Sequence, residues 1–365
     1  MIAKEVYLKN FRNYTEETLL FDPGVNIIYG DNAQGKTNIL EAVYLFSMGK
    51  ASRAKKDVEL IRYGEDRADI ALTFSDAQRE SKAEISLFAN RRKTISVNEI
   101  PIRKNSELVG RFRVVYFGPE YLGLVKEGPK GRRKNMDILI SQLRPRYFSA
   151  LGDVKKIVES KNALLKMPSP NKAMLEILNE KLASASAEVI ACRAEYIDKI
   201  GVLASEIQKE ISSGTEVLSL TYQSCIGEAR GLTREDIKQK ISNKLADVGT
   251  RELELRESTV GPHREDIGYD INGKEAKVFA SQGQQKTVVL VQKLAEVELM
   301  RQETGENPVL LLDDIMSELD KNRRGFILSH IRDMQILITC TDLEGFPKDG
   351  ERRLFQIEQG SVMPN

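Results

Sequence analysis

Apolar positions along the chain alternate with polar ones in some segments and form short unbroken runs in others. Residues 2–9 alternate, which predicts a half-exposed β-strand. Val25–Tyr29 and Val114–Phe117 are compact apolar runs, typical of strands that are covered on both faces. Further strands are predicted at residues 68–74, 83–89, 94–97, 217–222 and 309–313.

Between these strands the apolar period changes to that of helices. Apolar residues recur three or four positions apart from Leu175 to Ile211, with a phase shift near Ile200. This stretch predicts about forty helical residues, roughly 60 Å long at 1.5 Å per residue. Residues 146–166 carry a second helical stripe, and the proline-rich turn Met167–Asn171 separates the two. The pattern fits an antiparallel hairpin that projects as an arm, and it fits a compact helical bundle equally well.

Composition restricts the class of protein. Charged residues make up 30% and hydrophobic residues 41% of the 365 residues, the profile of a soluble globular protein of two or three domains. The net charge of +1 excludes a polycation, so a surface for nucleic acid must be local. The three cysteines match no metal or redox spacing, and neither a signal segment nor an apolar run of the roughly 20 residues that span a membrane occurs. We therefore expect a cytoplasmic protein.

The segment Gly30–Thr37 has the spacing G-x-x-x-x-G-K-[ST] of a phosphate-binding loop. A predicted strand precedes it and a helical pattern follows it, the geometry that aims backbone N–H groups and a helix N-terminus at one anion. Gly30 and Gly35 permit backbone angles that a Cβ would resist, Lys36 would reach the outer phosphates, and Thr37 would ligate Mg²⁺. The flanking elements disfavour the alternative of a chance glycine turn. The other loop residues expected around the phosphates are Asp31, Asn32, Ala33 and Gln34.

Two acids, Asp313 and Asp314, end the apolar run that begins at Val309. A carboxylate at the carboxyl end of a central parallel strand enters the crevice where α/β folds bind ligands, and it supplies a Mg²⁺ ligand in phosphate-loop NTPases. Asp313 lies 277 residues after Lys36 (313 − 36), so its carboxylate reaches the Mg²⁺ of the phosphate loop only if both ends of the chain fold together. We therefore predict one ATPase domain interrupted by a helical domain. The predicted parts are 1–125 and 251–365 for the ATPase and 126–250 for the helical domain.

Three further segments carry candidate functional residues. Arg12 follows the first strand and either contacts the nucleotide, through phosphate or the adenosine end, or remains solvated. Ser281 begins an amphipathic helix and offers a second anion-binding helix start. His263 and Arg264 either hold a loop or take part in acid–base chemistry, and the lack of a nucleophile beside them in sequence favours the structural role.

Basic residues are concentrated after Pro119. From Lys126 to Lys166 there are eleven Lys or Arg against four Asp or Glu. Arg132, Arg133 and Lys134 lie near the start of this stretch. Such charge suits contact with DNA phosphates, and it suits a solvated helical face as well.

Several motifs together resemble the ABC-type, SMC-like ATPases of DNA repair and chromosome maintenance. The phosphate loop alone would not distinguish families, but the set, in this order over nearly the whole chain, is specific. The resemblance implies an ABC-type α/β ATPase head with an inserted helical, coiled-coil-like arm. The motifs are Asn10–Tyr14, the phosphate loop followed by Asn38–Ala42, Gly261–Arg264, Ser281–Gln285, Leu311–Asp314 and Ser317–Asp320.

The resemblance implies that ATP joins two copies head to tail, because in ABC ATPases the nucleotide lies between the phosphate loop of one subunit and the signature serine of the other. Lys36 and Thr37 would then bind phosphate and Mg²⁺, and Asp313 would bind Mg²⁺. Ser281 and Gln284 would face the γ-phosphate across the dimer. Three residues would be closest to the chemistry, namely Lys36, Ser281 and Asp314, the last in place of the glutamate that orients the attacking water.

Departures from the family pattern predict slow hydrolysis. Asp314 is one methylene shorter than glutamate, and Thr341 replaces a histidine near the γ-phosphate. Gly118 stands where relatives have a metal-contacting glutamine. Ala33 replaces the commonest glycine, a minor change if its φ is negative.

The resemblance also implies partners: DNA, as duplex, gap or junction, and accessory proteins with which a recombinase is loaded at gaps, with weak DNA-stimulated ATPase activity as a switch. A structural chromosome ATPase and an energy-coupling transporter subunit are the alternatives. The predicted helices are too short for the first, and the missing histidine and the helical insertion count against the second.

Overall fold

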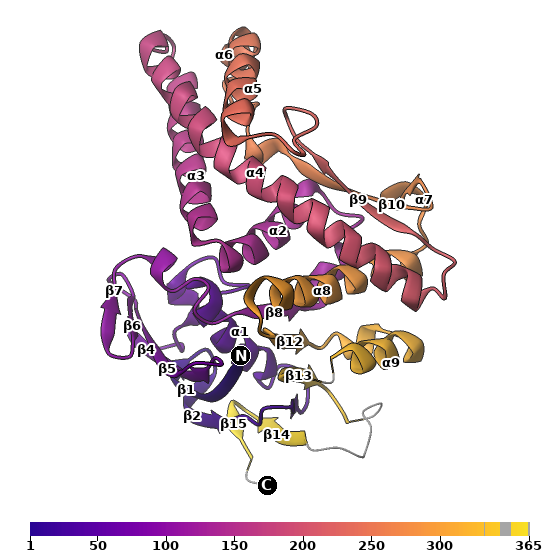
Figure 1. Cartoon of the computed structure of the whole chain (residues 1–365). Coiled ribbons are helices and arrows are strands. Elements are labelled where there is room, and N and C mark those ends of the chain that lie inside the picture. The colour runs from indigo at the N-terminus through magenta and orange to yellow at the C-terminus, as the bar shows by residue number, and fades with distance from the viewer. Residues whose placement is uncertain (332, 344–351, 364–365) are drawn as a thin grey trace. The chain divides into compact units, whose positions relative to one another are not determined.

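The computed structural model describes residues 1–331, 333–343 and 352–363 (Figure 1). The chain divides into two compact units, one formed by Met1–Gly123 with Val289–Asn365 and the other by Leu124–Val288. The second unit therefore extends beyond residue 250, where the sequence pattern placed its end, because strand β10 (Asp266–Ile271) pairs with β9 (Leu218–Gln223).

A six-stranded, mainly parallel sheet forms the centre of the first unit. Its strand order is β15-β14-β3-β13-β12-β8. Three of its strands are buried at every position, as the unbroken apolar runs predicted for Val114–Phe117 and Val309–Asp313; the third, Ile336–Cys340, was not predicted. Because β3, β12 and β13 run parallel, their carboxyl ends meet at one edge, which brings the phosphate loop, Asp313 and Thr341 together. The strands are β3 (Val25–Tyr29), β8 (Val114–Phe117), β12 (Val309–Asp313), β13 (Ile336–Cys340), β14 (Arg352–Glu358) and β15 (Ser361–Val362).

A second, antiparallel sheet of order β2-β1-β4-β5-β6-β7 belongs to the same unit. Helix α1 (Lys36–Met48) contacts strands of both sheets, which explains why almost its whole circumference is buried. Helix α9 (Lys321–His330) follows β12 and a short 3₁₀ turn. The strands are β1 (Ile2–Phe11), β2 (Tyr14–Leu20), β4 (Arg67–Ser75), β5 (Glu80–Phe88), β6 (Thr94–Val97) and β7 (Ile100–Ile102). The 3₁₀ turns are η1 (Asp57–Leu60), η2 (Asn105–Glu107), η3 (Pro119–Gly123) and η5 (Met316–Glu318).

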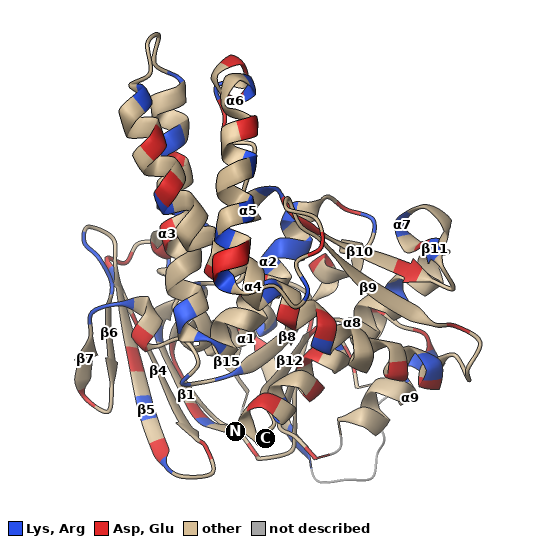
Figure 2. Ribbon diagram, turned by 45° about the horizontal axis from the view of Figure 1, so that its top comes forward, with Lys and Arg blue, Asp and Glu red and all other residues tan. Residues whose placement is uncertain are grey.

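The second unit is helical around one long helix, α4 (Lys172–Ile211). Its N-cap Asn171 accepts a hydrogen bond from the backbone N–H of Met174, and the helix runs unbroken through the predicted phase shift. The antiparallel hairpin of α3 and α4 is confirmed, and α5 packs on α4 as a third helix. Basic and acidic residues are interleaved along α3 (Figure 2). The other elements are α2 (Pro129–Leu143), α3 (Pro145–Leu165), α5 (Arg234–Asp247), α6 (Gly249–Leu255), α7 (Ala276–Phe279), η4 (Pro262–Arg264) and β11 (Lys274–Glu275).

Helix α8 (Gln282–Thr304) starts in the second unit and continues into the first, because the division falls between Val288 and Val289. In the second unit it follows β10 and α7, and in the first it leads to β12. Among the residues that the structure describes, no helix combines the length and the apolarity needed to cross a membrane.

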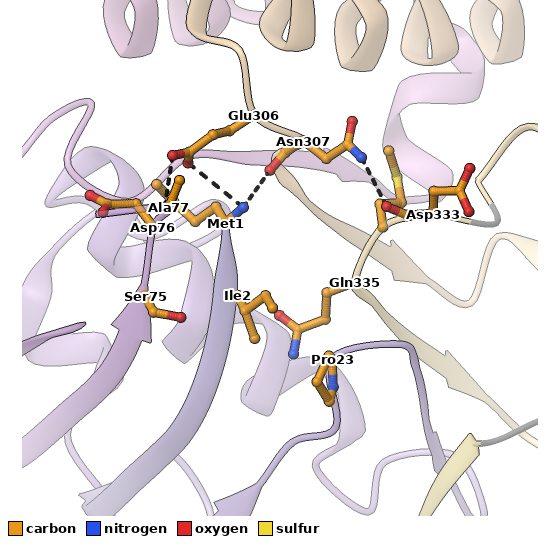
Figure 3. Close-up of a pocket in the computed structure, with 11 residues that line it drawn as sticks. Met1, Ile2, Pro23, Ser75, Asp76, Ala77, Glu306, Asn307, Asp333 and Gln335 are labelled. Carbon is orange, nitrogen blue, oxygen red and sulfur yellow. Dashed lines mark hydrogen bonds and ion pairs between the residues drawn. The ribbon is translucent and has the colours of Figure 1, made fainter. Parts of the chain in front are cut away.

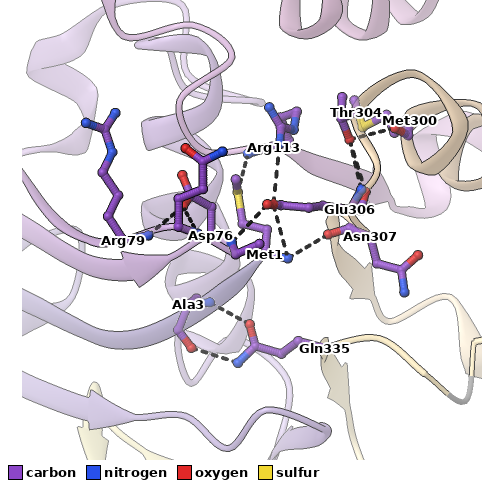
Figure 4. A network of polar contacts seen from close by, with 12 residues as sticks. Met1, Ala3, Asp76, Arg79, Arg113, Met300, Thr304, Glu306, Asn307 and Gln335 are labelled. Atoms are coloured by element: carbon purple, nitrogen blue, oxygen red, sulfur yellow. Dashed lines mark hydrogen bonds and ion pairs between the residues drawn. The ribbon is translucent and has the colours of Figure 1, made fainter.

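The amino ends of the parallel strands line a cavity of about 400 Å³ in the first unit (Figure 3). There Gln335 joins the two sheets, because its side chain accepts a hydrogen bond from the Ala3 N–H and donates one to the Ala3 carbonyl, both at 2.7 Å (Figure 4). The cavity therefore lies at the edge of the sheet away from the phosphate loop. Its lining residues are Met1, Ile2, Pro23, Ser75, Asp76, Ala77, Glu306, Asn307, Asp333, Met334 and Gln335.

Candidate nucleotide site

The phosphate loop lies between β3 and α1 and depends on two glycines. Gly30 has φ of 145°, and a Cβ there would lie 2.4 Å from the carbonyl oxygen of Ile357. Gly35, the N-cap of α1, has φ of 114°, and a Cβ there would lie 2.5 Å from the amide of Asn13. Both positions therefore exclude any side chain, which leaves a cradle lined by backbone at the start of α1.

Lys36 folds back over this cradle. Its Nζ donates hydrogen bonds to the carbonyl oxygens of Gly30 at 2.6 Å and Asp31 at 2.7 Å, and the side chain is almost fully buried. Burial lowers the pKa of Lys36, and the charge of Asp314 opposes that shift. The ammonium group thus lies at the phosphate cradle, where a bound phosphate would replace the loop carbonyls as its hydrogen-bond acceptor.

Ala33 has φ of +64°, in the left-handed region. The expectation that alanine is a minor change at this position required a negative φ and is wrong. A Cβ in this region costs about 1 kcal/mol, which explains why glycine is the favoured residue here.

Asn13 and the turn after β14 brace the loop. The Asn13 side chain donates to the Gln34 carbonyl and accepts from the Asn38 side chain, both at 2.8 Å. From the other side, the backbone N–H of Gly360 donates to the same Gln34 carbonyl at 3.1 Å, and that of Gln359 donates to the Gln34 side chain at 2.6 Å. Asn13 belongs to the motif Asn10–Tyr14, but nothing in that motif predicted this role.

Asp313 lies beside the loop and is almost fully buried. Its Oδ1 accepts hydrogen bonds from the hydroxyls of Thr37 at 2.7 Å and Thr339 at 2.8 Å, and its Oδ2 accepts one from the hydroxyl of Tyr116 at 2.8 Å. The residues predicted to share a Mg²⁺, Thr37 and Asp313, are thus brought into contact. Sequence reasoning missed Thr339 and Tyr116, which lie inside buried strands with no motif around them.

The donor set fits Mg²⁺. A hydroxyl and a carboxylate are the hard oxygen ligands that this ion prefers, and Mg²⁺ is usually held by one or two protein groups together with phosphate oxygens. In the described part of the chain no group of three His, Cys, Asp or Glu is placed to hold a metal. Thr37 and Asp313 would therefore bind the ion only together with the oxygens of a nucleotide.

Asp314 and Thr341 flank this pair. Asp314 is half-buried, has φ of 51°, and donates its backbone N–H to the hydroxyl of Thr339 at 2.9 Å. Burial raises the pKa of the Asp314 carboxyl, and the nearby charge of Lys36 opposes that shift. Thr341 is exposed directly after β13, and its hydroxyl donates to Asp342 at 3.4 Å.

Gly118 follows β8 on the other side of Asp313. A Cβ at this position would lie 2.6 Å from the Glu120 carboxylate and 2.9 Å from the hydroxyl of Tyr116. The space that a glutamine side chain would use is therefore occupied by these two neighbours.

Arg12 is paired within the chain. Its guanidinium donates to the buried Glu41 carboxylate at 2.8 and 3.0 Å and to the Glu59 carbonyl at 2.8 Å. Glu41 lies on α1, so this pair ties the end of β1 to the helix that follows the phosphate loop. The predicted contact of Arg12 with a nucleotide stays a prediction.

Ser281 is the exposed first residue of a reciprocal cap on α8. Its hydroxyl accepts from the Gln284 N–H at 3.2 Å, and the Gln284 side chain accepts from the Ser281 N–H at 2.9 Å. Gln284 also donates to Glu216 at 2.8 Å. Its amide is thus used inside the second unit, whereas Ser281 lies at an open helix start.

The basic segment differs from the prediction at one residue. Arg132 is buried, and its guanidinium donates to both Asp266 oxygens at 2.7 Å and to the carbonyls of Leu124 and Glu127. The prediction that Arg132 contacts DNA is wrong, because only 4% of its side chain is exposed and its guanidinium is paired within the chain. Arg133 is half-buried and donates to the Glu265 carbonyl at 2.5 Å, whereas Lys134 is exposed.

His263 and Arg264 hold a loop. The His263 Nε2 donates to the Ser258 carbonyl at 3.2 Å, and Arg264 donates to the same oxygen at 2.8 and 3.1 Å. Burial lowers the pKa of His263. These contacts match the structural role that the sequence favoured.

The fold and the site define an ABC-type ATPase head. The family model described as RecF/RecN/SMC N terminal domain matches residues 2–359. Two SMC heads share the fold, with TM-scores of 0.54 and 0.55 at 16% and 17% identity.

Relatives with higher sequence identity show which family within this class of ATPases the chain belongs to. The DNA replication and repair proteins RecF of Acetivibrio thermocellus and Clostridium acetobutylicum are 38% and 40% identical, over 99% of this chain and 99% of theirs. A solved structure of the recombination mediator protein RecF-ATPrS in the RecFOR pathway is 39% identical, covers 99% of this chain and 97% of its own, and has a TM-score of 0.93. A second, of RecF-ATP, has a TM-score of 0.91 at 39% identity, with coverage of 99% and 96%. The chain belongs to the RecF family.

Proposed function

We propose that this chain is an ATP-dependent DNA-binding protein of recombinational repair and replication, which ATP joins into a head-to-tail dimer. The observation that carries the proposal is the contact of Thr37 with Asp313 at 2.7 Å beside the buried Lys36. Residues from the two ends of the chain thereby form one site with a cradle for phosphate and two oxygen ligands for Mg²⁺. The names of the relatives, which are DNA replication and repair proteins, support the role in DNA metabolism.

Each residue of the site has one role in this proposal. Lys36 and the N–H groups at the start of α1 bind the phosphates, and Thr37 with Asp313 holds Mg²⁺, which neutralises phosphate charge when it is bound. Ser281 of a second copy closes the site, because an exposed helix start presents N–H groups to an anion. Asp314 orients the attacking water, and its short side chain makes hydrolysis slow enough to act as a release switch.

The proposed substrate is DNA at gaps or at junctions of single and double strands, with Arg133 and Lys134 as candidate phosphate contacts. The family resemblance extends to partners: RecR and RecO would act with the protein to load a recombinase. The site of action would be the cytoplasm, the compartment that holds DNA in the bacteria named above.

Sedimentation with a non-hydrolysed ATP analogue and Mg²⁺ tests the dimer. Wild type should change from monomer to dimer, and Lys36→Met and Ser281→Arg should remain monomeric. Lys82→Met, which changes an exposed lysine of β5, is the control and should dimerise. A wild-type protein that stays monomeric with saturating nucleotide would refute the proposal, as would a Ser281→Arg variant that dimerises normally.

A further inference from the structure

Three hydroxyl groups donate hydrogen bonds to the carboxylate of Asp313, and one of them, that of Thr37, would also bind Mg²⁺. Thr37 donates to Oδ1, and a lone pair of the same hydroxyl would bind Mg²⁺. Thr339 also donates to Oδ1, whereas Tyr116 donates to Oδ2. Tyr116 is the partner that holds Oδ2.

Packing holds the Tyr116 ring in a position from which its hydroxyl donates a hydrogen bond to Asp313. It is buried at 4% exposure, and its ring lies edge-on to those of Tyr44 at 5.6 Å and Tyr121 at 5.9 Å between centroids. A tyrosine hydroxyl is protonated at neutral pH, and this one presents its proton to Asp313 at 2.8 Å.

The position of this hydroxyl matches the departure at Gly118. A Cβ on residue 118 would lie 2.9 Å from the Tyr116 oxygen, so the hydroxyl fills the space beside the Gly118 backbone. Because Gly118 has no side chain, the Tyr116 hydroxyl can lie there and donate to Asp313.

We infer that Tyr116 is the positioning residue for Mg²⁺ in this chain, because its hydroxyl fixes Oδ2 of Asp313 from the side of Gly118. The inference rests on the proposed binding of a nucleotide with Mg²⁺, but not on the dimer. Second-layer partners of metal ligands typically change metal affinity 10–100-fold when they are lost. Loss of the Tyr116 hydroxyl leaves Oδ2 buried without a donor, which places this site in that range.

The test compares Tyr116→Phe with Tyr44→Phe. Tyr44 belongs to the same ring cluster and is equally buried, but it makes no contact with Asp313, so it controls for packing. A fluorescent, non-hydrolysed ATP analogue is titrated in EDTA and again at increasing Mg²⁺. In EDTA, the affinity for the analogue should be the same for wild type, Tyr116→Phe and Tyr44→Phe. The Mg²⁺ concentration that gives half of the Mg²⁺-dependent increase in affinity should rise roughly 10–100-fold in Tyr116→Phe alone.

Gly118→Ala is a second variant, which keeps the Tyr116 hydroxyl but displaces it. As a single change it should raise the Mg²⁺ concentration that the analogue requires. Added to Tyr116→Phe it should have no further effect, because both changes act on the same hydrogen bond. Superimposable Mg²⁺ titrations of Tyr116→Phe and wild type would overturn the inference. So would equal shifts in Tyr116→Phe and Tyr44→Phe, which would assign the effect to packing. The titrations are also run with each variant in the Ser281→Arg background, which should remain monomeric, so they separate this inference from a failure of the dimer.

Discussion

Arg193, at the centre of the second unit, offers the sharpest test of what holds that unit together. It lies on α4 with 1% of its side chain exposed. Its guanidinium donates to Asp137 at 2.9 Å on α2, and to the Pro262 carbonyl at 2.7 Å and Glu265 at 3.1 Å around η4. One side chain thus joins the long helix to two other parts of the unit. The perturbation is Arg193→Met, which keeps much of the volume and removes the charge.

The size of the effect follows from what is left behind. The Glu265 side chain is fully buried, so removal of Arg193 leaves a buried carboxylate without its ion-pair partner, a change that costs about 3–5 kcal/mol. The hydroxyls of Tyr222 and Ser224 still donate to Glu265, but neither carries charge. Lys199→Met is the matched control on the same helix. Lys199 pairs with Glu195 four residues earlier and is 43% exposed, so its loss should cost about 0.3–0.5 kcal/mol.

The assay is urea unfolding combined with hydrogen exchange of the α4 amides, because a chain of two units need not unfold in one step. Arg193→Met should lower the opening free energy of α4 by about 3–5 kcal/mol, and Lys199→Met by less than about 1. Equal values for the two variants would refute the view that the buried ion pairs hold this unit together.

Substitutions at Asp314, Ala33 and Lys161 test local claims. Asp314→Asn should abolish most ATP hydrolysis, by about 100-fold or more, and raise the melting temperature of the nucleotide-free protein. Because burial raises the pKa of Asp314, the stability from this group is full below its ordinary value of about 3.9 and is lost as pH rises through the higher folded value, so the gain should shrink as pH is lowered. Ala33→Val should cost at least about 1 kcal/mol in urea unfolding, because a β-branched residue fits φ of +64° worse than alanine, whereas Ala33→Gly should cost nothing. Lys161 pairs with the buried Glu252 at 2.5 Å, so Lys161→Met should lower the free energy of unfolding by about 3–5 kcal/mol. The same change at the exposed Lys155 on the same helix should cost almost nothing.

The sequence was sufficient where a residue's role follows from its neighbours in the chain. The phosphate loop could be predicted because strand, loop and helix are contiguous, and the apolar run before Asp313 identified a central strand. The approach of Thr37 to Asp313 was likewise predictable, because one shared Mg²⁺ demands it. Helix α4 could be predicted from the spacing of its apolar residues alone.

The sequence was insufficient where the role depends on long-range packing. Arg132 looked like a surface cation because its charged neighbours are local, but its partner Asp266 lies 134 residues later. Tyr116 looked like an ordinary core residue, since nothing nearby shows that its hydroxyl meets Asp313, 197 residues away. The end of the second unit was misplaced for the same reason, because the pairing of β10 with β9 is invisible in a linear pattern.

The strand order of the parallel sheet has a consequence for synthesis of the protein. Strand β3 lies between β13 and β14, so both of its neighbours are made last. At about 5–20 residues per second, the ribosome needs roughly 14–55 s to travel the 277 residues from Lys36 to Asp313 (313 − 36). During that interval the nascent chain carries a phosphate loop whose supporting strand has two unpaired edges. We therefore expect a ribosome stalled before β12 to leave a product that lacks Asp313 and both neighbours of β3 and does not bind nucleotide.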